Sequence, residues 1–534
     1  MKKIIFLISL AFFSLASYAT VDYNVVTKAM QDEMNRAKKE LKMKGFDKPY
    51  YIAYYFKDSE SVKITASLGA LVSSVTPKYK DIEVSIRVGD YKFDNSNFKV
   101  SFFDSDYPAY QTPGDGYGTI RAALWQETDN VYKEALETLS KKKGFMKQKN
   151  ITDYYDDFSP AAKVNLKEEK NTEKFDKEYF EALSKQLSAI GLKYPEIEKF
   201  VVRIIYNNEN KYYLDNLGSS YYNNPVEIIL SVESSVRAAD GFLLENSFEK
   251  NFALVTDFPP SDKLMETVKE FASDTAAQSK AVKAEPYIGP ILLYKYAAAE
   301  FFMNLFVYNI EKIKPEYSDK GTFTNAGEFK DRLGLKVISN IFDVTDNPLA
   351  KEYKGAALSG YYRVDDEGVK AQKVDIVKHG KLVNFLTTRS LIKGQKGSTG
   401  HGKKRGMEKF PSALTSNIFF TPLKTIPYNE LKSKLREECA KQELEYCLMA
   451  KGGLGNNFTV YKIYTNDGRE EVAYGARMMN NTPRALRDII YAGDDIDVYN
   501  FYRGSLIAPS VIISEMEISP IDEKPVRKPL VSRP

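Results

Sequence analysis

The chain has 534 residues, 43% of them hydrophobic and 13% aromatic, which is enough for roughly two to four structural units with their own cores. Its 76 basic and 72 acidic residues give a formal charge of +4, which excludes the strong overall field that holds nucleic acid or an anionic membrane. Two cysteines exclude a disulfide framework, and Cys439 and Cys447 either form one small-loop disulfide or remain free.

Residues 1–19 have the pattern of a secretory signal peptide. Lys2 and Lys3 precede an apolar run, and Ser17-Tyr18-Ala19 places small residues where a signal peptidase reads them. The run is too short for a helix across the hydrocarbon core, which needs about 20 residues, and no later segment is long and apolar enough. We expect cleavage after Ala19 and a periplasmic or secreted protein without a membrane span.

Residues 20–146 are predicted to form a first α+β unit. Helical spacing alternates there with β-branched and aromatic runs, and Trp125, in the long second helix, is expected in the core. The expected helices are Val26–Lys44 and Thr119–Gly144, and the expected strands are Tyr50–Phe56, Val62–Val72 and Lys80–Val88.

A charged segment without a clear period, 147–170, is predicted to be a linker to a second α+β unit, residues 171–284. This unit repeats the order of a helix followed by antiparallel strands. Its expected helices are Thr172–Ile190 and Ser261–Lys280, and its expected strands are Lys199–Tyr206, Lys211–Asp215, Val226–Glu233 and Gly241–Phe252.

Residues 285–518 are predicted to form a mostly β C-terminal domain. An apolar strand or turn, Ile288–Leu293, precedes an Ala-rich helix, Tyr296–Tyr308, and one further helix, Tyr428–Gln442, interrupts a series of strands. The fold class is therefore α+β with mostly antiparallel sheets, and not a doubly wound nucleotide fold. The Pro-rich residues 519–534 are expected to be a disordered tail.

The residues alone yield no active site. Zinc hydrolysis needs several converging His, Cys or carboxylate ligands, and the chain has only two His. His379 is expected in an exposed hairpin turn. His401 lies in a Gly-rich basic loop, expected to be flexible, whose backbone amides can hold a carboxylate or phosphate. The alternative is a mobile surface loop without a function.

Several strings, in this order, resemble the TldD/PmbA family of metallopeptidase-related proteins, once called modulators of DNA gyrase. They are Arg87-Val88-Gly89-Asp90-Tyr91 with Asp94 to Phe98, Ile120 to Trp125 with Thr128-Asp129 and Tyr132-Lys133, Val364-Asp365-Asp366-Glu367-Gly368, Gly380-Lys381-Leu382, Arg389, Thr399-Gly400-His401-Gly402 and Asn417. Together they span most of the mature chain.

The resemblance implies a TldD/PmbA-like fold and a metal motif, H-E-x-x-x-H, on the helix that opens the C-terminal part. This sequence departs from that motif at each ligand, with Tyr294, Lys295 and Ala299 at the corresponding positions. A protonated Lys has no lone pair and repels a cation, so the zinc mechanism does not carry over. No catalytic residue, metal ligand or cofactor is therefore expected. A cleft is expected around these residues: Thr399, Gly400, His401, Gly402, Arg405, Arg389, Asp366 and Glu367.

The leading hypothesis is an exported, non-catalytic PmbA-like subunit, which binds unfolded or short peptides and pairs with a metal-bearing TldD-like peptidase or with a second copy of itself. One alternative is a metallopeptidase whose zinc site is rebuilt from His401 and distant carboxylates. A second alternative is a stand-alone peptide-binding module of the cell envelope. Export and the charge balance exclude nucleic acid as a partner under each of them.

Overall fold

The computed structural model describes residues 21–521, apart from 100–109, 113, 153–154, 312–315, 319–320, 324–326, 393–394, 405–409, 455–457, 480–481 and 503. The predicted signal peptide and residues 522–534 of the predicted tail lie outside the described residues. Residues 519 and 520 of that tail are the last two of a strand. Among the helices described, none is both long and apolar enough to cross a membrane.

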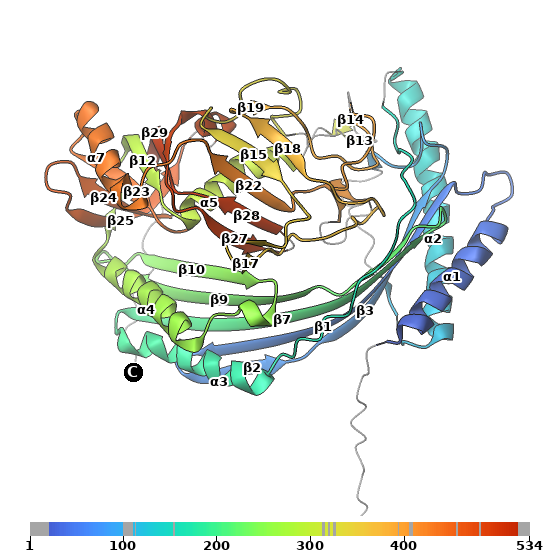
Figure 1. Cartoon of the computed structure of the whole chain (residues 1–534), viewed down its shortest axis with the longest axis horizontal. Helices are drawn as coiled ribbons and strands as arrows, with labels where there is room; N and C mark the ends of the chain where they lie inside the picture. Colours follow the sequence, from blue (N-terminus) through green and yellow to red (C-terminus); the bar gives the residue numbers. More distant parts are fainter. Residues whose placement is uncertain are drawn as a thin grey trace, which may run out of the picture.

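A long, curved, mostly antiparallel sheet forms one half of the molecule, and its concave side faces the other half (Figure 1). Its main strand order is β10-β9-β7-β1-β3-β5, with β2, β8 and β6 attached beside it. The strands are β1 (Tyr51–Ser67), β2 (Ala70–Val75), β3 (Lys78–Arg87), β5 (Tyr110–Gln111), β6 (Asn165–Lys167), β7 (Ile197–Asp215), β8 (Ser220–Asn223), β9 (Val226–Arg237) and β10 (Leu243–Phe252).

The period-two pattern of the sequence gives this sheet its buried face. In β9, Val226, Ile228, Leu230 and Val232 are buried and alternate with less buried residues, as expected where one face of a strand packs on a core. The longest pairing joins β1 to β7. Because of this pairing, strands from residues 20–146 and from residues 171–284 belong to one continuous sheet.

Helices cover the convex side of this sheet at its two ends (Figure 1). The helices α1 (Tyr23–Glu40) and α2 (Tyr117–Gln148) share one core with β1 and β3, whereas α3 (Lys177–Ser188) and α4 (Ser261–Ala277) share another with β7 and β9. The prediction that Trp125 is in the core is wrong, because its side chain is 53% exposed. It lies beside the buried stripe of α2, which runs through Ile120, Ala123, Leu124, Glu127, Thr128 and Val131.

The C-terminal half is built from two main sheets around one apolar core. The first contains β11 (Val282–Lys283), β25 (Glu470–Met478), β24 (Phe458–Tyr464), β23 (Tyr446–Ala450), β12 (Tyr287–Leu293), β29 (Val511–Pro520) and β26 (Ile489–Ala492). The second contains β19 (Lys381–Leu382), β18 (Val374–Lys378), β15 (Phe342–Asp346), β22 (Asn417–Pro422), β28 (Gly504–Ala508) and β27 (Asp497–Phe501). The α+β class with a mostly β C-terminal region is confirmed.

Three smaller sheets complete the fold. They are β4 (Phe98–Lys99) with β13 (Glu316–Ser318) and β14 (Gly321–Phe323), β16 (Glu352–Tyr353) with β17 (Ala356–Ala357), and β20 (Gly402–Lys403) with β21 (Ser412–Ala413). The pairing of β4 with β13 joins the N-terminal to the C-terminal part of the chain.

The C-terminal helices lie on opposite sides of the first sheet. The predicted helix from Tyr296 is α5 (Tyr296–Phe302), which continues as a π-helical turn (Met303–Val307) into α6 (Tyr308–Glu311) within the core. Helix α7 (Leu431–Lys441) packs on the outer side, where a disulfide joins its Cys439 to Cys447 of β23. The disulfide alternative, which the sequence left open, is therefore the one that the structure contains.

Candidate functional site

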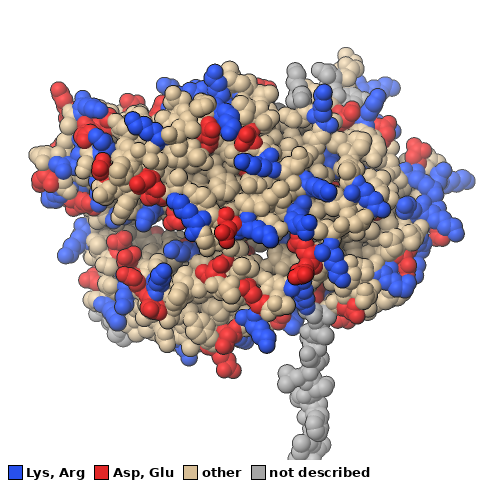
Figure 2. Space-filling view, viewed as in Figure 1, with Lys and Arg blue, Asp and Glu red and all other residues tan. Residues whose placement is uncertain are grey.

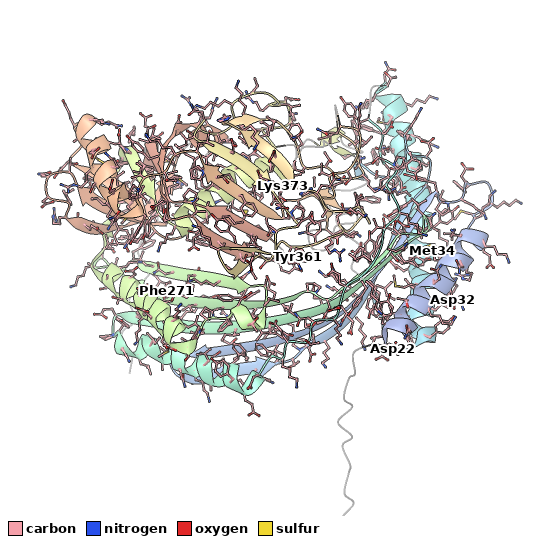
Figure 3. The ribbon with its side chains drawn as sticks, in the orientation of Figure 1. Asp22, Asp32, Met34, Phe271, Tyr361 and Lys373 are labelled. Carbon is pink, nitrogen blue, oxygen red and sulfur yellow. A yellow bond between two sulfur atoms is a disulfide. The ribbon has the colours of Figure 1, made fainter. Side chains whose placement is uncertain are left out.

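Two neighbouring cavities lie between the concave face of the N-terminal sheet and the C-terminal half, and we call them together the interdomain cleft. The larger has a volume of about 510 Å³ and the smaller about 420 Å³, and Tyr502 lines both. Figure 2 shows the surface hollowed along the line where the two halves meet. In Figure 3, Tyr361, which lines the smaller cavity, lies between the C-terminal half and the sheet. The fold thus provides a groove of the size that binds small or extended ligands.

The segment from α5 to α6 forms one wall of the larger cavity, and it contains Ala299, one of the three positions at which the resemblance predicts a degenerate metal motif. Ala299 lines the cavity with its methyl group. Tyr294 packs instead against the α7 cluster and lies 6.4 Å from the Tyr428 ring between ring centres. Lys295 is exposed at a positive φ of 48°, and its N–H donates to Ser510 Oγ at 2.8 Å. Only one of the three predicted positions therefore faces the cleft.

These residues do not fit a zinc ion. A phenol that packs elsewhere, an ammonium and a methyl group offer no set of lone pairs that converge on one point. Within the part of the chain that the structure describes, three or more His, Cys, Asp or Glu side chains nowhere gather as metal ligands do. No chemical step through a metal can be derived from this site.

His401 is fully buried and serves the fold. Its Nε2 lies 2.9 Å from Asp346 Oδ1 in β15, and its Nδ1 lies 3.0 Å from Thr399 Oγ1 and 3.1 Å from the Thr399 carbonyl. Asp346 also accepts hydrogen bonds from the N–H and hydroxyl of Ser416. Both ring nitrogens are thus engaged, which leaves no open position for the rebuilt zinc site of the first alternative. The expectation of a flexible loop is wrong, because this imidazole fixes residues 399–404 to β15.

The backbone amides of this loop do hold carboxylates, as the sequence suggested, but they are the chain's own. The N–H of Gly402 donates to Asp365 Oδ2 at 2.9 Å, and the N–H of Lys404 donates to Asp366 Oδ2 at 2.8 Å. The N–H of Arg389 donates to Glu367 Oε2 at 2.6 Å. The predicted cleft residues are therefore brought together, but in a buried network. Arg405 lies outside the described residues.

Burial controls the ionisation of this network. It raises the pKa of Asp365 well above the ordinary value, and the negative charge of Glu367 adds to the effect. Burial also raises the pKa of Glu367, against the opposing positive charges of Arg87 and Arg389. The turn docks onto the N-terminal sheet, where the Tyr55 hydroxyl donates to the Asp366 carbonyl at 2.6 Å and Gly368 lies against the Tyr213 ring. Its role is to join the two halves.

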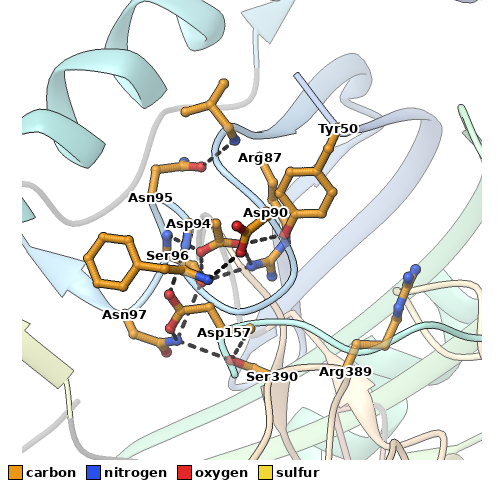
Figure 4. Close-up of polar contacts among 12 residues, drawn as sticks. Tyr50, Arg87, Asp90, Asp94, Asn95, Ser96, Asn97, Asp157, Arg389 and Ser390 are labelled. Atoms are coloured by element: carbon orange, nitrogen blue, oxygen red, sulfur yellow. Dashed lines mark hydrogen bonds and ion pairs between the residues drawn. The ribbon is translucent and has the colours of Figure 1, made fainter. Parts of the chain in front are cut away.

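A second buried charge network lies beside it and was not predicted from the sequence (Figure 4). Arg87 donates to Asp94 Oδ2 at 2.8 Å, and Lys142 pairs with Asp157. The guanidinium groups of Arg87 and Arg389 lie 3.9 and 3.8 Å from the centre of the Phe158 ring, so that one ring from the predicted linker contacts a cation from each half. Residues so far apart in sequence carry no local signal of this arrangement.

The polar residues that do face the larger cavity were also missed. They include Glu300 and Glu311 from the α5–α6 wall, Glu249 from β10, and Tyr499 from β27. A signal was present, since polar residues recur at helical spacing along a segment otherwise rich in Ala and Phe. The prediction that His379 lies in an exposed turn is confirmed: it sits between β18 and β19, and its N–H donates to Asp343 Oδ1 at 2.7 Å.

Comparisons with known proteins identify the C-terminal half. Residues 287–520 match the model of the PmbA/TldA metallopeptidase C-terminal domain. A metalloprotease of Archaeoglobus fulgidus is 28% identical over 170 residues, 32% of this chain and 35% of the relative. A metalloprotease of Methanocaldococcus jannaschii is 35% identical over 99 residues, 18% of this chain and 21% of the relative. This chain thus aligns with about a third of the length of the first relative and about a fifth of the second.

Solved structures share the fold over nearly the whole chain. A candidate modulator of a DNA gyrase from Thermotoga maritima has a TM-score of 0.62 at 15% identity and covers 92% of this chain and 100% of its own. TldE from Thermococcus kodakarensis has a TM-score of 0.61 at 12% identity and also covers 92% of this chain and 100% of its own. Residues 287–520 therefore match the PmbA/TldA metallopeptidase C-terminal domain, and the chain as a whole shares its fold with these structures.

Proposed function

We propose that this chain is an exported, non-catalytic member of the TldD/PmbA family. It holds peptide in the interdomain cleft and pairs with a metal-bearing TldD-like subunit. One observation carries the proposal: the structure has a cavity over α5, whereas the positions that the resemblance equates with the metal motif have a phenol, an ammonium and a methyl group. A cavity of this size suits an extended peptide segment. Export rests on the pattern of the first nineteen residues.

The lack of a catalytic metal is tested on the purified mature chain. We expect elemental analysis after dialysis against zinc to find far less than one zinc per chain, because His401 is engaged at both nitrogens. His379→Ala serves as a control for weak surface binding, since this His is exposed. One zinc per chain that survives dialysis, together with chelator-sensitive peptide cleavage abolished by His401→Ala, would contradict the proposal.

Pairing and export are tested in the native cell. We expect the tagged chain in the envelope fraction, where it should co-purify with a relative that bears H-E-x-x-x-H. A variant without residues 2–19 is the control, and it should stay in the cytoplasm and lose the partner. A chain that reaches the envelope and purifies without such a relative would favour the stand-alone binding module, or a pair of identical chains if its mass is doubled.

A further inference from the structure

One face of the segment from Tyr296 to Glu311 lines the larger cavity along its length. The residues on this face recur at alternating steps of three and one, as on a helix. They are Tyr296, Ala299, Glu300, Met303, Asn304, Val307, Tyr308 and Glu311. Glu300 and Glu311 are eleven residues apart, about 16 Å at the rise of an α-helix. The cavity therefore has two separate ends, one at each of these carboxylates.

The end at Glu311 is matched in charge and hydrogen bonds. Glu311 Oε1 accepts two hydrogen bonds of 2.8 Å from the N–H and hydroxyl of Thr415. Lys404 pairs with Glu83, and the ammonium of Lys403 lies 4.7 Å from the centre of the Tyr362 ring. The charges at this end are already engaged within the protein.

The end at Glu300 carries negative charge without a cation. Glu300 Oε2 accepts a hydrogen bond of 2.6 Å from the N–H of Leu454, and no described Lys or Arg forms an ion pair with this carboxylate. Burial raises the pKa of Glu300. Glu249 lies on the edge strand β10 on the opposite wall, and it too has no ion pair with a described residue. A carboxylate that is partly desolvated without a counter-charge gains from a cation brought in by a ligand.

Aromatic rings surround the same end. The rings of Tyr296 and Tyr499 lie 6.4 Å apart between centres and are inclined by 62°. The Tyr499 hydroxyl is buried and has no hydrogen-bond partner among the described residues. Phe501 and Tyr502 also line the larger cavity. Electron-rich rings beside a carboxylate are the surroundings that proteins use to bind organic cations.

We propose that the Glu300 end of the larger cavity binds the cationic side chain of a Lys or Arg in an extended peptide, with Glu300 and Glu249 as counter-charges and Tyr296 and Tyr499 as aromatic walls. This inference rests on the proposed peptide-binding function and adds a selectivity to it. Neutral or acidic side chains gain no affinity at this end of the cavity, since Glu300 repels an added negative charge.

The test uses the mature chain and a short fluorescent peptide of Ser, Ala and Gly with one central Lys and both ends blocked. We expect replacement of Lys by norleucine to weaken binding about tenfold, the size of one partly desolvated ion-pair and cation–π contact. Glu300→Gln should weaken binding of the Lys peptide to the same extent and leave the norleucine peptide unchanged, as a double-mutant cycle of two contacting groups requires. A norleucine peptide with a free N-terminus separates a side-chain cation from an α-amine.

Two variants protect the interpretation. Glu249→Gln removes the second carboxylate from an exposed position, where the substitution does not threaten folding. It should weaken binding of the Lys peptide less than Glu300→Gln does. Glu266→Gln makes the same chemical change on the exposed side of α4 and should bind as the unaltered chain does. Equal binding of the Lys and norleucine peptides would overturn the inference and leave the proposed function standing. Restored affinity of the unblocked norleucine peptide would overturn the side-chain assignment. Failure of every peptide to bind would overturn the proposed function and the inference with it.

Discussion

Lys142 is a buried charge whose partners all come from other elements. Its side chain is 2% exposed, and its Nζ donates to the carbonyls of Asp94 and Ser96 at 3.0 and 2.7 Å. Its counter-charge, Asp157, comes from the segment predicted to be a linker and also accepts the Asp94 N–H at 2.9 Å. An ammonium in such a place is tolerated only while it is paired.

Asp157→Asn removes this counter-charge and keeps the shape. We expect the free energy of unfolding to fall by about 3 kcal/mol, because the variant leaves a buried ammonium uncompensated. Denaturant titration measures the change. Asp129→Asn, which breaks the exposed pair with Lys133, should cost less than about 1 kcal/mol. Equal losses of unfolding free energy in the two variants would show that the buried ion pair stabilises the fold no more than the exposed pair does.

Glu367 gives the stability a pH dependence of defined sign. Burial raises its pKa in the folded chain, so between the ordinary pKa of glutamate and the raised value the folded state binds more protons than the unfolded state. Stability therefore falls as the pH rises through this window. Glu367→Gln keeps an acceptor for the Arg389 N–H and should flatten the fall, which melting temperatures measured from about pH 4 to neutrality would show. Identical slopes would contradict the assignment.

At this scale the sequence predicted which side chains matter but not what they do. The strings around Glu367 and His401 were singled out, and they do meet. Their partners, however, are distant: His401 bonds Asp346, 55 residues away, and Arg389 reaches the Ser159 carbonyl across 230 residues. Local chemistry cannot distinguish a mobile Gly-rich loop from one fixed by a distant carboxylate, which is why the flexible loop was wrongly expected.

Among the elements, the link between α7 and β23 can be tested directly. The disulfide between Cys439 and Cys447 closes a loop of eight residues and lies in the small buried cluster beneath α7. The double variant Cys439→Ala, Cys447→Ala should lose about 2–3 kcal/mol, since a short closed loop restricts the unfolded chain only moderately. A reducing agent should lower the stability of the unaltered chain and leave the variant unchanged. A variant as stable as the parent would contradict this.

The helices follow their sequence patterns closely, whereas their ends and irregularities do not. The helix expected at Val26–Lys44 is Tyr23–Glu40, because the Asp22 side chain accepts the Asn24 N–H and begins it earlier. The helix expected at Tyr296–Tyr308 contains a π-helical turn, which no spacing of residues predicts. Two of the three carboxylates that line the larger cavity, Glu300 and Glu311, lie on this segment, so these site residues were missed although their helix was predicted.

For the whole molecule, the sequence cannot show that the strands before and after residues 147–170 form one sheet. The two runs have the same order of elements, which favours two similar units, but the pairing of β1 with β7 depends on contacts between residues such as Ala53 and Asp215. Long-range pairing is decided by burial of a shared face and not by local pattern. The result is a single curved wall, and this wall gives the cleft its length.

Phe158 is the point at which the two halves depend on one another. Its ring is buried, contacts Arg87 from β3 on the N-terminal side, and contacts Arg389 from the C-terminal half. Phe158→Ala should lower stability by about 3–5 kcal/mol and, because both arginines lose their shared contact, split a single calorimetric transition into two. Phe271→Ala removes a ring of the same size within the N-terminal half alone and should lower the melting temperature without a second transition. If Phe158→Ala unfolds in one transition, the halves are coupled mainly through the turn at Asp366, whose carbonyl accepts a hydrogen bond from the Tyr55 hydroxyl. In that case Tyr55→Phe should reduce the cooperativity of unfolding more than Phe158→Ala does.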